Sequence, residues 1–167
     1  MTHISEILFV DPAVADIETI VGNLRPGVEA VLLDSKRPAA RQIAITLADR
    51  SGLDAVHVIA HGTSGRVVFA AGEWSVQTVA SEADDLAAIG RSLAAEGKLR
   101  VWSCDTARGE GGEAFVEALR TAANAEICAA TTRIGAATLG GTWQLQSDRC
   151  TGAAIDHGWG GALQCRA

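Results

Sequence analysis

The chain has 167 residues and a mass of 17.3 kDa, the size of one domain with room for a short appendage. Its formal net charge is −6 and its pI is near 5.1, which argues against a nucleic-acid binder because neutralising phosphates requires a concentrated basic face. Hydrophobic residues make up 48% of the chain. No uninterrupted apolar run approaches the roughly 20 residues of a bilayer-spanning helix, so we expect a globular domain without a membrane span.

The N-terminal segment is expected to be a buried strand rather than a secretory signal. It has no basic region, and its apolar run covers only residues 7–10. By default this predicts a cytoplasmic protein, while export by a route without a cleaved N-terminal signal stays open.

Short apolar runs alternate with helix-length segments along the chain. This alternation is typical of a mainly parallel sheet with helices on both faces, because the strands of such a sheet are apolar on both sides. The expected strands are 7–10, 28–33, 55–60, 99–103 and 126–130, and the expected helices are 14–24, 38–50, 82–96 and 112–123.

Two segments interrupt the alternation, and each is expected to form a small β-hairpin. Residues 65–76 contain two β-prone runs that meet near Gly72, and residues 137–145 carry two glycines at a turn position. The first hairpin should project beside the strand ends as a wall or lid. Trp74 should then pack on the fold or on a substrate rather than enter the main core.

A change of composition near residue 147 divides the chain. Residues 1–146 form the expected α/β domain, and residues 147–167 form a Gly-rich appendage bracketed by Cys150 and Cys165. A disulfide between these two cysteines would stabilise the folded chain by roughly 3 kcal/mol. The alternative is two reduced surface thiols.

Residue types that catalysis uses follow the expected strands. The first two strands end in Asp11 and Asp34, the third in His61-Gly62 and the fourth in Cys104-Asp105. In an open parallel sheet, ligands bind beyond the carboxyl ends of the strands, and neighbouring strands lie about 4.8 Å apart. We therefore expect His61 and Cys104 to face one substrate, as a proton-transfer partner and a nucleophile.

The other histidine and cysteine within the expected sheet are predicted to be structural. On a strand, His57 and His61 stand roughly 13 Å apart, too far to share a metal ion. His57 is therefore expected to be a satisfied core or sheet-face histidine. Cys128 lies in an Ala-rich strand and is expected to be buried. Neither a metal nor a cofactor is expected.

The segments AVHVIAHG (55–62) and LRVWSCD (99–105) resemble the caspase–gingipain–separase superfamily, the clan CD cysteine peptidases, and within it the CHAT-like branch. In that superfamily an apolar strand ends in His-Gly and the next core strand ends in the nucleophilic Cys. A narrower resemblance is to a domain of unknown function near the N-terminus of very large bacterial cadherin-like surface proteins. The shared motifs are Val10-Asp11, Ser51 to Ala55, His61-Gly62, Cys104-Asp105 and Leu139 to Trp143.

This resemblance covers about residues 5–146 and implies a three-layer caspase/gingipain-like α/β fold. It also implies that Cys104 is the nucleophile and that His61 is the general acid/base that protonates the leaving amine. The backbone N–H groups of Gly62 and Cys104 would form the oxyanion hole. An absent Cβ at Gly62 would let a substrate carbonyl approach the backbone closely.

The acids at the strand ends have two interpretations. Asp11, Asp34 or Asp105 could line a pocket that selects Arg or Lys before the scissile bond, as in several members of the superfamily. Alternatively, Asp11 and Asp34 cap the helices that follow them.

The implied function is that of a cysteine endopeptidase or self-processing module acting on a peptide or protein. A catalytically idle, peptidase-like module for assembly or docking in bacterial surface proteins is the alternative, and acyl transfer on a non-peptide group is a third. The acidic residue after Cys104 and the lack of an evident residue that orients His61 favour the idle module.

Overall fold

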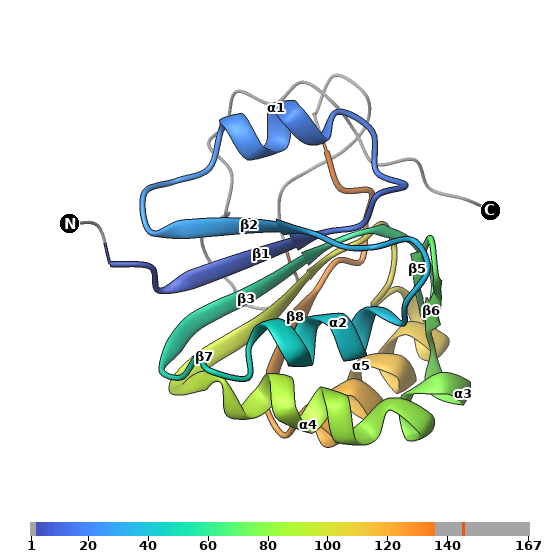
Figure 1. The fold of residues 1–167 in the computed structure, drawn as a ribbon. Coiled ribbons are helices and arrows are strands. Elements are labelled where there is room, and N and C mark those ends of the chain that lie inside the picture. The colour runs from blue at the N-terminus through green and yellow to red at the C-terminus, as the bar shows by residue number, and fades with distance from the viewer. Residues whose placement is uncertain (1–2, 136–144, 146–167) are drawn as a thin grey trace.

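Five parallel strands form the centre of the fold in the computed structural model, which describes residues 3–135 and 145 (Figure 1). Their order across the sheet is β2-β1-β3-β7-β8, and every neighbouring pair is parallel. The strands are β1 (Glu6–Val10), β2 (Val28–Leu32), β3 (Leu53–Ile59), β7 (Leu93–Trp102) and β8 (Glu126–Ala129).

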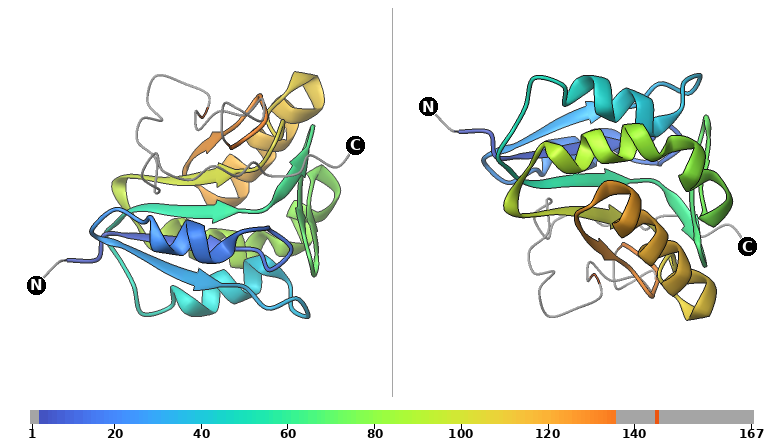
Figure 2. Two further views of the ribbon diagram at one scale, coloured as in Figure 1. Left: turned by 90° about the horizontal axis from the view of Figure 1, so that it is seen from above. Right: turned by 90° about the horizontal axis from the view of Figure 1, so that it is seen from below.

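Helices cover this sheet on both faces, as the views in Figures 1 and 2 show. Helix α1 (Ile17–Gly22) lies on one face. Helices α2 (Ala39–Thr46), α4 (Ala83–Arg91) and α5 (Gly109–Ala123) lie on the other. The protein is therefore a three-layer α/β fold, which confirms the expected fold class.

Strand alternation divides the buried side chains between the two faces. On β1, Ile7 and Phe9 belong to the large core under α2, α4 and α5, whereas Leu8 and Val10 belong to a smaller core on the α1 side. Successive side chains of a strand point to opposite faces, and both faces are covered here. This is why the strands read as continuous apolar runs.

The hairpin expected at 65–76 is confirmed. A third strand precedes it, so that the hairpin is part of a three-stranded sheet. Strands β4 (His61–Thr63), β5 (Arg66–Phe69) and β6 (Gly72–Trp74) form a separate antiparallel sheet. A short helix, α3 (Val76–Val79), and one 3₁₀ turn, η1 (Ala80–Glu82), connect it to α4.

The prediction that Trp74 stays out of the main core is wrong. Its side chain is 1% exposed and belongs to the large core. It packs edge-to-face against Phe69, with ring centroids 4.9 Å apart. The inner face of the hairpin therefore packs toward the helical layer, in the same core as Leu86 of α4 and Phe115 of α5.

The predicted helix 82–96 is too long, because its last residues begin β7. Leu93 pairs with Leu53, and the register then shifts before Lys98 pairs with Ala55. A Cβ atom at Gly97 would lie 2.5 Å from the carbonyl oxygen of Leu53. A glycine therefore permits the irregular pairing here, and strand pairing overrides the helical preference of the Ala-rich stretch.

Three expectations fall outside the described residues: the hairpin at 137–145 apart from Leu145, the boundary near residue 147, and the Cys150–Cys165 pair. Within the described part of the chain, none of the helices has both the length and the hydropathy to cross a bilayer.

Helices α4 and α5 approach each other through a glycine, which provides a test of the packing. A Cβ atom at Gly90 would lie 1.8 Å from the carbonyl oxygen of Ala123. We expect Gly90→Ala to lower the free energy of unfolding by about 3 kcal/mol, because backbone must move to admit one methyl group. Denaturant unfolding measures this.

The matched control is Gly22→Ala, at the end of α1, where no atom lies within 4 Å of the added Cβ. Since alanine has the higher helix propensity, this change should leave stability unchanged or raise it by up to about 1 kcal/mol. Equal effects of the two substitutions would contradict the close approach of α4 and α5.

Candidate active site

The expected pairing of the strands that precede His61 and Cys104 is confirmed. β3 and β7 are parallel neighbours, and Ile59 is the register partner of Trp102. His61 follows Ile59 by two residues, and Cys104 follows Trp102 by two residues. The two backbones therefore reach the same edge of the sheet at the same level.

Gly62 lies directly against the segment that carries Cys104. A Cβ atom at Gly62 would stand 2.7 Å from the Cβ of Ser103, 2.7 Å from the Oγ1 of Thr106 and 2.8 Å from the carbonyl oxygen of Cys104. The missing side chain is thus required by the close approach of the protein's own backbone. The approach of a substrate carbonyl to the backbone of Gly62 stays a prediction.

His61 is 5% exposed, and a backbone carbonyl orients its ring. Its Nε2 lies 3.0 Å from the carbonyl oxygen of Ala13. A carbonyl only accepts hydrogen bonds, so Nε2 carries the proton, and in the neutral ring Nδ1 is the basic nitrogen. The sequence did not reveal this orienting group, because a main-chain oxygen leaves no motif.

Asp11 supports the loop that holds His61. Its carboxylate is 1% exposed and accepts the N–H of Ala13 at 3.1 Å and the N–H of Ala70 at 2.9 Å. These bonds join the end of β1 to the turn between β5 and β6. In this geometry Asp11 is a positioning residue, and it does not cap the following helix, because the N-cap of α1 is Asp16.

Cys104 is completely buried, with an exposed fraction of 0%, and is not part of a disulfide. Its Sγ accepts the N–H of Ile134 at 3.4 Å. The same covering segment binds the loop after Cys104 twice more: Asp105 N–H donates to Thr132 O at 3.0 Å, and Ala107 N–H donates to Ala130 O at 2.8 Å. The segment after β8 therefore closes over the candidate nucleophile.

The two remaining candidate acids have partners. Asp34 accepts the N–H of Lys36 at 2.7 Å and lies 3.8 Å from Arg37, which makes it a turn-stabilising residue in front of α2. Asp105 lies 3.8 Å from Arg108 and keeps a quarter of its side chain exposed. Its backbone φ of 56° is in the left-handed region.

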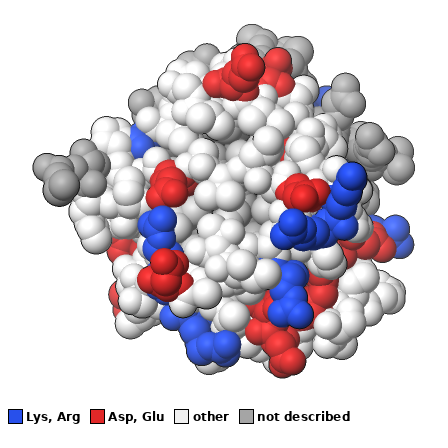
Figure 3. Space-filling model, viewed as in Figure 1, with Lys and Arg blue, Asp and Glu red and all other residues white. Residues whose placement is uncertain are grey.

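Charges of both signs are interleaved around an uncharged centre on the face shown in Figure 3. Exposed ion pairs among the described residues include Arg37–Asp34 and Arg41–Asp85. Pairs of this kind contribute little to stability, since water and salt screen them.

His57 is confirmed as a buried, satisfied histidine. Trp102 Nε1–H donates to its Nδ1 at 3.0 Å, and its Nε2 lies 2.6 Å from Glu6 Oε2. An indole nitrogen only donates, so Nδ1 is unprotonated and Nε2 donates to the carboxylate. Burial lowers the pKa of His57, and the hydrogen bond from His57 lowers the pKa of Glu6.

Cys128 is buried, as expected, and is disulfide-bonded. Of the two described cysteines, Cys104 is therefore the one that is not part of a disulfide.

Comparison with known protein families matches most of the chain. A family described as "Domain of unknown function (DUF4347)" matches residues 7–157, a span that includes the strand ends carrying His61 and Cys104. No curated protein and no solved structure matches the chain. The function therefore has to be argued from the geometry of the site.

The tautomer of His57 predicts how stability depends on pH. The unfolded chain protonates His57 as pH falls through the ordinary pKa of 6.5, whereas the folded chain resists protonation until a lower pH. The free energy of unfolding should therefore decrease as pH falls from about 7 to 5. Loss of the stability contributed by Glu6 belongs to a separate window below its ordinary pKa of 4.5.

Denaturant unfolding at pH 7.5 and pH 5.5 measures this dependence. His57→Gln should be less stable at both values, with a smaller difference between them. His3→Gln, which changes an exposed histidine, should keep the full difference. An unchanged difference in His57→Gln would show that another group causes the pH dependence.

Proposed function

The chain belongs to the family described as "Domain of unknown function (DUF4347)", and we propose that it is a cysteine peptidase or self-processing module with His61 and Cys104 as its dyad. The observation that carries this proposal is the register of β3 and β7, which brings the two backbones to one sheet edge. The Ala13 carbonyl adds to it by leaving Nδ1 of His61 as the basic nitrogen.

In the proposed reaction, Nδ1 of His61 accepts the thiol proton of Cys104 as Sγ attacks the carbonyl carbon of a peptide bond. The C–S bond forms, the C–N bond breaks, and the leaving amine takes the proton from His61. Water then hydrolyses the thioester and restores the thiol. The N–H groups of Gly62 and Cys104 are the proposed donors to the oxyanion.

The backbone beside the nucleophile supports a functional role. Asp105 has a left-handed conformation, which is uncommon for a residue with a side chain and costs about 1 kcal/mol. Strain of this kind clusters at active sites. The hydrogen bonds from Asp105 and Ala107 to the segment after β8 maintain it.

The burial of Cys104 means that access must be gained by movement. A substrate reaches Sγ only after the segment containing Ile134 has moved away, since its N–H group lies on the sulfur. This requirement suits a self-processing or regulated peptidase. It is also the observation that favours the second candidate, an idle peptidase-like docking module in which the thiol is a packing group.

The proposal places any preference for a basic residue before the scissile bond on Asp105. Both carboxylate oxygens of Asp11 accept backbone N–H groups, and Asp34 is engaged in its own turn. Asp105 directly follows the nucleophile and is partly exposed. Arg108, 3.8 Å away, is the cation with which a substrate would compete.

The dyad is tested by intact mass after incubation with a thiol-reactive peptidyl electrophile under non-reducing conditions. We expect a single adduct on Cys104, and labelling at least about a hundredfold slower in His61→Ala, because the ring activates the thiol. His3→Ala is the matched control and should label at the wild-type rate. No adduct on Cys104, or labelling independent of His61, would favour the idle module.

Specificity is tested by profiling cleavage of a peptide library. Wild type should cleave after Arg or Lys, and Asp105→Asn should lower that preference about tenfold, since a neutral amide no longer pairs the cation. Asparagine tolerates the left-handed backbone, so the loop should keep its shape. Glu110→Gln, at an exposed acid of α5, should leave the preference intact. Cleavage mainly after Asp, Asn or apolar residues would refute the preference and leave the dyad standing.

A further inference from the structure

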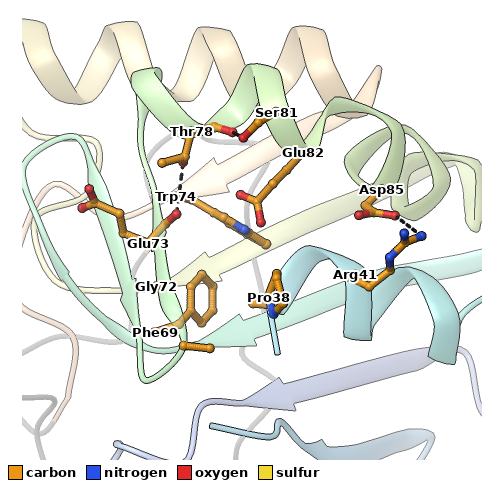
Figure 4. Close-up of a pocket in the computed structure, with 12 residues that line it drawn as sticks. Pro38, Arg41, Phe69, Gly72, Glu73, Trp74, Thr78, Ser81, Glu82 and Asp85 are labelled. Atoms are coloured by element: carbon orange, nitrogen blue, oxygen red, sulfur yellow. Dashed lines mark hydrogen bonds and ion pairs between the residues drawn. The ribbon is translucent and has the colours of Figure 1, made fainter. Parts of the chain in front are cut away.

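A second concave site lies away from His61, between the hairpin and the helical layer. This hairpin pocket has a volume of about 540 Å³, within the size range of ligand sites. Phe69 and Trp74 form its apolar wall, the N-terminal end of α2 at Pro38 faces them, and Glu82 and Asp85 reach it from the start of α4 (Figure 4).

The hairpin pocket and the candidate dyad lie on opposite faces of the small sheet. His61 pairs with Val68, and directly opposed residues of antiparallel strands share a face. Val67 pairs with Trp74, so Trp74 is on the other face, together with Phe69. The hairpin pocket is therefore a separate site, and an inference about it does not rest on the proposed peptidase activity.

Two buried polar atoms at this pocket have no hydrogen-bond partner. They are Nε1 of Trp74, whose side chain is almost completely buried, and Oε2 of Glu82. Figure 4 shows the Glu82 carboxylate close above the indole of Trp74. Leaving a buried donor and a buried acceptor unsatisfied costs free energy. A ligand that satisfies both would recover it.

The charges select a cation. Glu82 and Asp85 line the pocket, and Arg41 is the one base among the lining residues. Arg41 lies 3.4 Å from Asp85, and its side chain is 64% exposed. The side chain of Glu73 points away from the pocket, because its contribution is the carbonyl that accepts Thr78 Oγ1–H (Figure 4). Glu82 thus remains without a counter-charge among the lining residues.

We propose that the hairpin pocket binds the arginine side chain of a partner peptide, with the guanidinium on Glu82 and a peptide carbonyl accepting from Trp74 Nε1–H. The apolar stem of arginine fits the Phe69 wall. The planar guanidinium can bond carboxylates in a fork and lie against an aromatic ring. Burial and the neighbouring Asp85 both raise the pKa of Glu82, and a bound cation would offset these effects.

The test is an NMR titration of the ¹⁵N-labelled protein with N-acetyl-arginine methylamide, which carries both the guanidinium and a carbonyl. The indole N–H resonance of Trp74, assigned by its loss in Trp74→Phe, should shift in a saturable way at millimolar concentration. Binding should be about tenfold weaker in Glu82→Gln, because a charge-assisted hydrogen bond becomes a neutral one. The citrulline analogue, which is neutral and of the same shape, should bind at least tenfold more weakly.

The matched control is Asp84→Asn, which neutralises the neighbouring acid on α4 that is exposed and does not line the pocket. It should change the affinity less than twofold, and Cys104→Ala should not change it. No shift of the Trp74 resonance up to about 20 mM probe, equal binding of the citrulline analogue, or equal weakening by Asp84→Asn would each overturn the proposal. Because Cys104 is not required, these outcomes are independent of whether the dyad is active.

Discussion

The parallel pairing of β3 with β7 is the constraint on which both the fold and the candidate site depend. It places Ile59 beside Trp102, and each chain then continues by two residues to His61 and Cys104. Gly62 makes the continuation possible, because any side chain there would overlap with the Cys104 segment. If the two strands slipped by one residue, His61 and Cys104 would no longer reach the edge at the same level, and every side chain of the slipped strand would change face.

Hydrogen bonds that involve main-chain groups hold the site in place. The Ala13 carbonyl orients His61, and the Asp11 carboxylate holds both Ala13 and the hairpin turn at Ala70. On the other side, the segment after β8 binds the Cys104 loop through backbone atoms. The same hydrogen bonds that order the Cys104 loop also bury its thiol. A movement that exposes the thiol must therefore break them.

The small antiparallel sheet separates the candidate dyad from the hairpin pocket. One of its faces carries His61 and borders the candidate dyad, and the other packs Phe69 and Trp74 against the helical layer. A peptide bound in the hairpin pocket would contact β5 and β6, the two strands that follow β4. The alternation of side chains along a strand is what allows one short sheet to serve both sites.

The sequence by itself determined the class of the fold, the order of the strands along the chain and the residues at their carboxyl ends. Apolar runs such as 7–10 and the helix-length segments between them encode this information locally, through periodicity. The sequence also identified His57 as a core residue, because it lies within an apolar strand whose side chains are buried.

Only the tertiary structure decided which groups these residues meet. A main-chain carbonyl orients His61, main-chain N–H groups bind Asp11, and the carbonyl of Cys104 is among the atoms that lie against Gly62. Every residue carries such groups, so no sequence pattern distinguishes the ones that are used. Likewise, Leu93 to Glu96 suit a helix locally and become strand because β3 lies beside them. Trp74 enters the core because the hairpin packs against the helical layer, and a contact between distant segments cannot be encoded in either one alone.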